Sequence, residues 1–247
     1  MISNIRILTG FFIFVFLFGH SQLVFSEPSI QINSTAMDGK GVFLPKTIPY
    51  LIITDPAGLK VGYDPTIDKK YNEFNAGWTI SGSDEIEGFE AMFPPINGTY
   101  TIEVIGSSLM AFFIDISIYR EIAGEGLPSL EVRGVTDKGI TSQFQFTYNS
   151  DPSKPAGSAV RIATPSSLKQ DIALSRKIGW IDSDGIMMSL YKKAEAIEKS
   201  LARDDKNTAK NQLDALINEV NAQKGKHIKD EAIKILLEDV QYLMEHL

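Results

Sequence analysis

The middle of the chain alternates apolar and polar residues with a period of two, which is the pattern of half-buried β-strands. Tyr100, Ile102 and Val104 share one face of such a stretch, and Ile114, Ile116 and Ile118 share one face of another. The predicted strands are Pro49–Thr54, Leu59–Asp64, Gly88–Phe93, Gly98–Gly106, Leu109–Tyr119, Ser129–Thr136, Ile140–Tyr148 and Ser158–Ala163. Since no helical crossover fits between successive strands, they predict an antiparallel β-sandwich.

The C-terminal part of the chain has a helical period instead. Apolar residues recur at spacings of three and four in three successive stretches. These stretches contain Ile186, Leu190, Ala194, Ile197 and Leu201, then Leu213, Leu216, Ile217 and Val220, then Ile228, Ala232, Ile235, Leu236, Val240 and Leu243. A shorter helix is expected over Ser167–Ile178. Each stripe has to bury its apolar face, so a compact antiparallel bundle follows.

The distribution of proline and glycine separates the two parts. Every proline lies at or before Pro165, and only three of the nineteen glycines follow Thr164. Proline and glycine suit strands joined by turns and interrupt helices. The fold class expected is therefore multidomain α+β, with an all-β sandwich over residues 27–165 and a helical bundle over residues 166–247.

Residues 1–26 are expected to be a signal peptide. Arg6 is followed by the apolar run Thr9–Gly19, which is short for a membrane crossing of about 20 residues. Small residues then offer two cleavage positions, after Ser21 or after Ser26, and the second would make Glu27 the first mature residue. The alternative is an uncleaved N-terminal anchor, the one route by which we expect a membrane contact. The predicted location is secreted, periplasmic or at the cell surface.

Composition narrows the function further. The chain has no cysteine, so an exported form depends on packed cores rather than disulfides. Residues 27–167 carry ten basic and seventeen acidic side chains, whereas residues 168–247 carry thirteen and fourteen. An acidic front half repels phosphates, and neither half has a basic stripe with interleaved aromatic residues. We therefore expect no binding to nucleic acid.

The stretch Ile53–Pro65, ITDPAGLKVGYDP, gathers carboxylates, prolines and glycines. It could be a metal loop or the bend between two strands. Asp55-Pro56-Ala57-Gly58 separates two strand-like runs, where aspartate bonds the backbone, proline fixes φ and glycine supplies freedom. Asp64-Pro65 ends the second run in the same way, and Asn72 and Gly77 are expected to continue the loop. A cation needs several converging oxygens, so we favour a turn.

Two sequence segments, LIITDPAGLKVGYDP and FPPINGTYTIEVIG, resemble an Ig-like β-sandwich module of bacterial extracellular proteins. In that family a strand runs into T-D-P-x-G, then G-[YF]-D-P, and later P-x-x-G-T-Y-T. The resemblance covers about Pro49 to Tyr119. It implies secretion and a β-sandwich, and it implies no activity.

The helical part is similar to the small FIMAH domains found at the C-termini of secreted bacterial proteins. The similarity runs from about Leu168 to Leu247 and is strongest in INEVNAQKGKHI, residues 217–228. This stretch follows the family pattern F-[IV]-x-x-V-x-A-Q-x-G-K-x-I, except that Leu216 stands where phenylalanine is common. The resemblance implies a module appended to an extracellular protein, and it brings no catalytic residues.

Few residues suggest catalysis. There is no thiol, no G-x-S-x-G motif, and downstream of the signal segment the only imidazoles are those of His227 and His246. His227 suits the polar end of a helix better than a triad. The spacings C-x-x-C and H-x-x-x-H are absent, and IDSDGI (181–186) lacks the first and last ligands of an EF-hand, so it is interpreted as a helix cap. We expect no cofactor, no catalytic residue and no enzymatic activity.

Two weak binding candidates remain. The acidic run Ser81–Glu90 is expected to be a loop, and its acids could bind calcium, although a solvated loop is the simpler interpretation. These acids are Asp84, Glu85, Glu87 and Glu90. Tyr71 and Trp78 could form a platform on which a sugar stacks, although packing within the sandwich is the more ordinary role of aromatic residues.

Three functions follow, in order of preference. The first is an exported, non-catalytic binding or assembly protein with a protein or glycan partner at the bacterial envelope. The second is a carbohydrate-binding protein that uses the sandwich. The third is a hydrolase with an unrecognised pair of carboxylates, whose separation the sequence cannot give.

Overall fold

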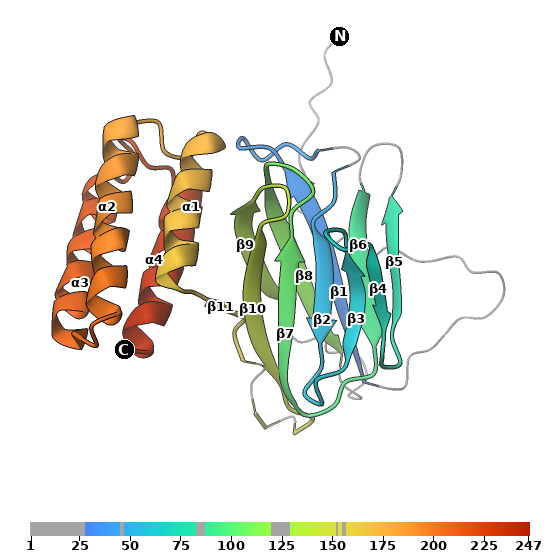
Figure 1. Cartoon of the computed structure of the whole chain (residues 1–247). Coiled ribbons are helices and arrows are strands. Elements are labelled where there is room, and N and C mark those ends of the chain that lie inside the picture. Colours follow the sequence, from blue (N-terminus) through green and yellow to red (C-terminus); the bar gives the residue numbers. More distant parts are fainter. Residues whose placement is uncertain (1–27, 45–46, 83–86, 120–128, 152, 155–156) are drawn as a thin grey trace, which may run out of the picture.

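The computed structural model of the chain describes residues 28–44, 47–82, 87–119, 129–151, 153–154 and 157–247 (Figure 1). The predicted signal peptide, residues 1–26, lies outside this range. Within it, strands β1 to β11 precede helices α1 to α4. The two parts stand side by side in Figure 1, with the helices along one edge of the β-structure. The predicted order of a β-domain followed by a helical domain is therefore confirmed.

Two antiparallel sheets form the sandwich. The five-stranded sheet has the order β5-β6-β1-β8-β9, and the six-stranded sheet has the order β11-β10-β7-β2-β3-β4. The strands of the first are β1 (Ser29–Met37), β5 (Gly77–Gly82), β6 (Glu87–Phe93), β8 (Met110–Tyr119) and β9 (Leu130–Thr136). Those of the second are β2 (Tyr50–Thr54), β3 (Lys60–Asp64), β4 (Lys69–Asn72), β7 (Gly98–Ile105), β10 (Thr141–Tyr148) and β11 (Val160–Ile162).

The alternating residues point where the sequence predicted. Tyr100, Ile102 and Val104 of β7 are buried between the sheets, as are the isoleucines of β8. Tyr100 stacks on Phe146 of β10 with the ring centroids 5.1 Å apart. Phe93 of β6 also stacks on Tyr100, with the ring centroids 5.5 Å apart. These inward aromatic and β-branched side chains supply the apolar area that holds the two sheets together.

Three strands were not predicted: β1, β4 and β5. The acidic run Ser81–Glu90 is expected to be a loop, but Ser81 and Gly82 end β5 and residues 87–90 begin β6, and these two strands pair antiparallel. Residues 83–86 lie outside the described residues. Asn72 and Gly77, expected in a loop, end β4 and begin β5. KKYN is short and polar, and GWTISG alternates over only two apolar residues, Trp78 and Ile80. Pairing with neighbouring strands, rather than a long pattern of their own, therefore makes these segments β-structure.

The four helices are α1 (Pro165–Lys177), α2 (Asp184–Leu201), α3 (Lys206–Ala222) and α4 (Asp230–Glu245). Thr164 and Ser167 form a reciprocal capping box at α1, Ser183 caps α2 and Asp205 caps α3. The predicted apolar stripes are buried against one another. In the part of the chain that the structure describes, no helix combines the length and apolar character needed to span a membrane.

Candidate functional site

The helical domain packs against one corner of the sandwich. Met37, Ala111 and Val135 form a cross-strand row over β1, β8 and β9, on the outer face of the five-stranded sheet. Ala111 and Val135 belong to the same buried apolar cluster as the helix residues, and Met37 packs against it. An outward row that would otherwise meet water is thus covered, so the two domains share one hydrophobic core across their seam.

Trp180 anchors one end of this seam. Its side chain is buried, and its Nε1–H donates a hydrogen bond of 3.1 Å to the carbonyl oxygen of Gly39, in the turn after β1. A Cβ atom on Gly39 would lie 2.1 Å from the carbonyl oxygen of Ile178. Only glycine permits this approach of the two backbones, because real Cβ contacts do not become so short.

The end of the segment most similar to FIMAH, residues 217–228, contacts the backbone next to Trp180. Ile181 and Ile228 form an antiparallel bridge, and the Lys229 N–H donates to the Trp180 carbonyl across 2.9 Å. His227 Nδ1 and Asp182 Oδ1 lie 2.7 Å apart on the exposed side of the bridge. The connection between α3 and α4 therefore fixes the tryptophan that contacts the sandwich.

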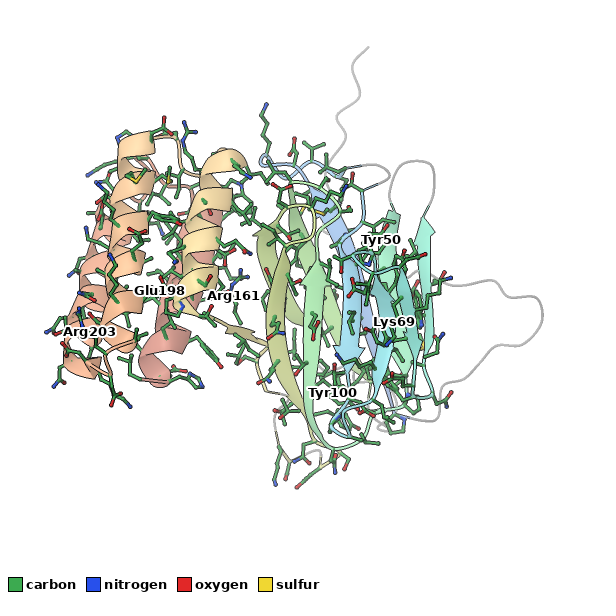
Figure 2. All side chains as sticks on the ribbon, in the orientation of Figure 1. Tyr50, Lys69, Tyr100, Arg161, Glu198 and Arg203 are labelled. Carbon is green, nitrogen blue, oxygen red and sulfur yellow. The ribbon has the colours of Figure 1, made fainter. Side chains whose placement is uncertain are left out.

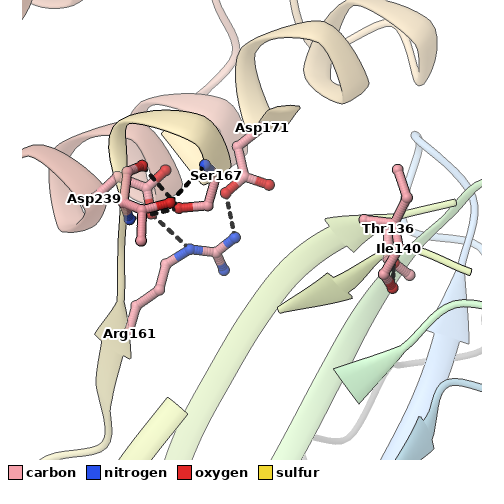
Figure 3. Close-up of polar contacts among 7 residues, drawn as sticks. Thr136, Ile140, Arg161, Ser167, Asp171 and Asp239 are labelled. Carbon is pink, nitrogen blue, oxygen red and sulfur yellow. Dashed lines mark hydrogen bonds and ion pairs between the residues drawn. The ribbon is translucent and has the colours of Figure 1, made fainter. Parts of the chain in front are cut away.

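Arg161 anchors the other end of the seam, between the sandwich and the helices (Figure 2). From β11 its Nε–H donates to Asp239 Oδ1 of α4 across 2.8 Å, and its Nη2–H donates to Asp171 Oδ2 of α1 (Figure 3). The three side chains are at most 3% exposed. The guanidinium also lies 5.1 Å above the ring of Phe144 in the sandwich core. One arginine thus joins two helices to two strands.

Burial determines the charge of this cluster. Burial alone lowers the pKa of the Arg161 guanidinium, but Asp171 and then Asp239 outweigh burial and raise it above its ordinary value. Burial raises the pKa of the Asp239 carboxyl well above its ordinary value; Arg161 opposes this rise and Asp171 adds to it. One arginine cation between two carboxyls, one of which favours its neutral form, lets the cluster approach zero net charge.

The cluster is not fully bonded. Among the described residues, Arg161 Nη1, Asp171 Oδ1 and Asp239 Oδ2 are buried without a hydrogen-bond partner. Such groups carry a desolvation cost, so this ion-pair network is weak grounds for high stability. It defines instead one arrangement of the domains, because any other arrangement would separate buried opposite charges.

The sequence contained a signal for this cluster that the periodicity argument passed over. Asp239 follows Leu236 by three residues and precedes Leu243 by four, so it occupies the apolar stripe of its helix. Asp171 lies three residues after Leu168 on the first helix. A carboxylate at a stripe position needs a buried partner. The pairing with Arg161, 78 residues before Asp239, is visible only in the fold.

The acids of Ile53–Pro65 take part in turns, as predicted. Asp55 Oδ1 accepts hydrogen bonds from the N–H groups of Ala57 at 2.9 Å and Leu59 at 2.8 Å. Asp64 Oδ1 accepts from the N–H of Thr66 at 2.8 Å and from its hydroxyl at 2.6 Å. The interpretation of this stretch as bends between strands is confirmed.

The calcium candidates are only partly visible. Asp84 and Glu85 lie outside the described residues, and of Glu87 only its backbone position in β6 is described. Glu90 lies in β6, where its Oε1 accepts a hydrogen bond of 3.0 Å from Gln31. Within the described residues no three histidine, aspartate or glutamate side chains gather as metal ligands. The calcium hypothesis stays a prediction.

Tyr71 and Trp78 lie on edge strands of different sheets. The Trp78 ring stacks on Phe89 at 5.4 Å, and its Nε1–H donates to Asn72 Oδ1 across 2.5 Å. Lys69 Nζ lies 4.3 Å from the centroid of the Tyr71 ring. Each aromatic ring thus already has a protein neighbour, and their role as a sugar platform stays a prediction.

The IDSDGI stretch is a helix cap, as interpreted. Ser183 accepts a hydrogen bond from the Ile186 N–H at the start of α2, and Asp184 Oδ1 lies 2.6 Å from Arg176 Nε. That arginine lowers the pKa of the Asp184 carboxyl. Asp184 therefore joins the first turn of α2 to the last turn of α1.

Comparison with known proteins assigns the helical part. Residues 165–245 match the FIMAH domain. This region coincides with helices α1 to α4, so the predicted FIMAH resemblance is confirmed for the C-terminal third of the chain. No curated protein and no solved structure matches the chain. The candidate functional site is thus the seam at which a FIMAH-like domain meets an antiparallel β-sandwich.

Proposed function

We propose that this protein is a non-catalytic binding or assembly protein of the bacterial envelope or extracellular space, in which an Ig-like sandwich and a FIMAH-like domain act as one rigid unit. The observation that carries the proposal is the docking of the matched helical domain through the buried Arg161, Asp171 and Asp239. A catalytic module must expose reactive groups to substrate. Here Asp171 and Asp239 bind Arg161. The carboxylates of the Ile53–Pro65 turns accept hydrogen bonds from backbone N–H groups.

Rigidity is what such a unit contributes to binding. A partner that contacts both domains does not have to freeze their relative motion, so it loses less entropy on association. The seam has an apolar row in its middle, Trp180 at one end and Arg161 at the other. Three separated contacts restrict rotation as well as translation of one domain on the other.

The location can be tested in the source bacterium with the full chain carrying a C-terminal epitope tag. We expect the mature protein to begin at Glu27 and to be found in the medium or on the cell surface. Surface-retained protein should be degraded by protease added to intact cells. Full-length, unprocessed protein confined to the cytoplasm would contradict the proposal.

The absence of catalysis is tested separately. Purified full chain should hydrolyse none of a panel of chromogenic glycosides and esters faster than a protein-free blank. Asp171 and Asp239 are a buried carboxylate pair, so the Asp239→Asn variant serves as a control for folding and not as a catalytic knockout. Turnover by the parent chain above the blank would support the hydrolase hypothesis instead.

A further inference from the structure

A depression of about 190 Å³ lies at the seam, where β11 leaves the sandwich and α1 begins. Its walls come from β10 and β11 in the sandwich and from the first turn of α1. The residues that line it are Thr141, Ser142, Gln143, Arg161, Ile162, Thr164 and Ser167. Since both domains supply walls, the depression exists only while they are docked.

The lining is rich in neutral hydrogen-bonding groups. Five of the seven lining residues carry a hydroxyl or an amide. Thr141 and Gln143 are exposed, and within the described part of the chain their side chains form no hydrogen bond. Thr164 Oγ1 accepts from the Ser167 N–H and keeps its own hydrogen to donate. These groups supply both donors and acceptors to a ligand.

The electrostatics of the depression disfavour an anionic ligand. Arg161 is the one ionised lining residue; its side chain is 3% exposed and is engaged with the two aspartates. Glu103 lies beside Gln143 on the neighbouring strand, so an anion would meet a carboxylate, of which Lys60 Nζ, 4.0 Å from Oε1, is the partner. The capping box already bonds N–H groups at the start of α1, which weakens the attraction of that helix end for anions.

An uncharged polar track continues from the depression along β10. Gln145 and Thr147 follow Gln143 on the outer face, and Thr101 and Thr99 lie opposite them on β7. Gln145 Nε2 lies 3.3 Å from Thr101 Oγ1, and the two threonine hydroxyls of the next pair lie 3.2 Å apart. A ligand that extends out of the depression would therefore meet more hydroxyl and amide groups.

We propose that a neutral oligosaccharide binds here, with one sugar in the depression and the next along β10. Sugar hydroxyls pair with Thr141, Gln143 and Thr164, and the half-buried Ile162 offers an apolar contact to a C–H face of the ring. The inference rests on the proposed function, of which it names the partner class and the site. It uses neither Tyr71 nor Trp78.

The test is amide-shift NMR on the ¹⁵N-labelled full chain. The probes are chitotetraose, cellotetraose and xylotetraose, with trigalacturonate as the anionic comparison. At least one neutral probe should give saturable shifts at residues 141–143 and 164–167 at millimolar concentration. No saturable shift with any neutral probe, or equal shifts with trigalacturonate, would overturn the inference.

Two variants separate a binding role from a structural one. Gln143→Ala should weaken binding of the responding probe by about tenfold or more, since it removes an amide that can both donate and accept. Gln241→Ala, which removes an exposed glutamine from α4, should leave binding unchanged. Equal affinity of the two variants would remove the depression as the site. A protein that is processed and exported but binds none of the probes would contradict the oligosaccharide site and leave the proposed function unaffected.

Discussion

Arg161, in the last strand of the sandwich, donates a 2.8 Å hydrogen bond to Asp239, in the last helix, and both side chains are buried. The two residues are 78 positions apart in the chain. Their contact joins the domains at a place where the sequence changes from strand to helix composition. Arg161 is thus the residue whose loss should most clearly separate the domains.

Arg161→Met should lower the free energy of unfolding by about 3–5 kcal/mol, because it leaves two buried carboxyls without their cation. Urea denaturation followed by circular dichroism measures the change. Arg133→Met is the matched control, because its pair with Glu131 is about half exposed on both sides and such pairs contribute roughly 0–1 kcal/mol. Equal losses in the two variants would show that the buried pair has no special role.

Asp239 should make stability depend on pH. Its folded-state pKa lies above the reference value of 3.8, so its favourable contribution is complete below that value and is lost as pH rises through the folded pKa. Asp239→Asn imitates the neutral acid. The unfolding free energy of this variant minus that of the parent should therefore increase with rising pH.

Taking the difference at each pH, by urea denaturation, cancels the titration of acids that do not interact with Asp239. Glu238 is one of them, since burial raises its pKa as well. A difference that stays constant from acid to neutral pH would mean that Asp239 has the same pKa in the folded and the unfolded protein. A difference that falls with rising pH would mean that its folded-state pKa is lowered instead, so that the cluster carries a net negative charge at neutral pH.

Gly39→Ala should loosen the other end of the seam. The added Cβ would fall 2.1 Å from the carbonyl oxygen of Ile178, so the turn has to move and the bond to Trp180 stretches or breaks. We expect a loss of about 1–3 kcal/mol, the usual cost of overpacking. In a Trp78→Phe background Trp180 is the sole tryptophan, and its emission should shift to longer wavelength.

The control for this substitution is Gly77→Ala in the same background. Gly77 has nothing within 4 Å of the position of its Cβ. Its replacement should change neither the emission of Trp180 nor the urea midpoint by a comparable amount. An unchanged emission spectrum in Gly39→Ala would mean that Trp180 does not depend on this close approach.

Asp55→Ala should cost about 1–3 kcal/mol, because two backbone N–H groups lose their acceptor. Asp55→Asn retains the accepting oxygen and should lose much less. Thermal melts measure both variants, with and without millimolar calcium. A rise of the parent's melting temperature with calcium that Asp55→Asn abolishes would restore the metal hypothesis for this loop.

Much of the fold followed from local patterns. Tyr100, Ile102 and Val104 lie on the buried face that their alternation predicted, and Leu213 and Val220 lie in the predicted helical stripe. The edge strands β4 and β5 escaped prediction because an edge strand faces few neighbours and tolerates an irregular pattern. Asn72 therefore ends a strand that the sequence made look like a loop.

The seam was the least predictable part. Ala111 and Val135 are apolar on the outer face of their sheet, which is a sign of a covered surface, yet nothing local says what covers them. The same holds for Thr141 and Gln143. They look like ordinary solvent-facing strand residues until the start of α1 is placed beside them.

The sequence by itself determined the two domains, their order and the turns at Asp55 and Asp64, because periodicity, proline and glycine act over a few neighbouring residues. Only the tertiary structure decided that Arg161 meets Asp171 and Asp239, and that Trp180 meets Gly39. Such pairs depend on how whole elements pack in space. Excluding water around such polar and charged groups costs free energy that only their mutual contact offsets, and the chain order keeps these groups far apart.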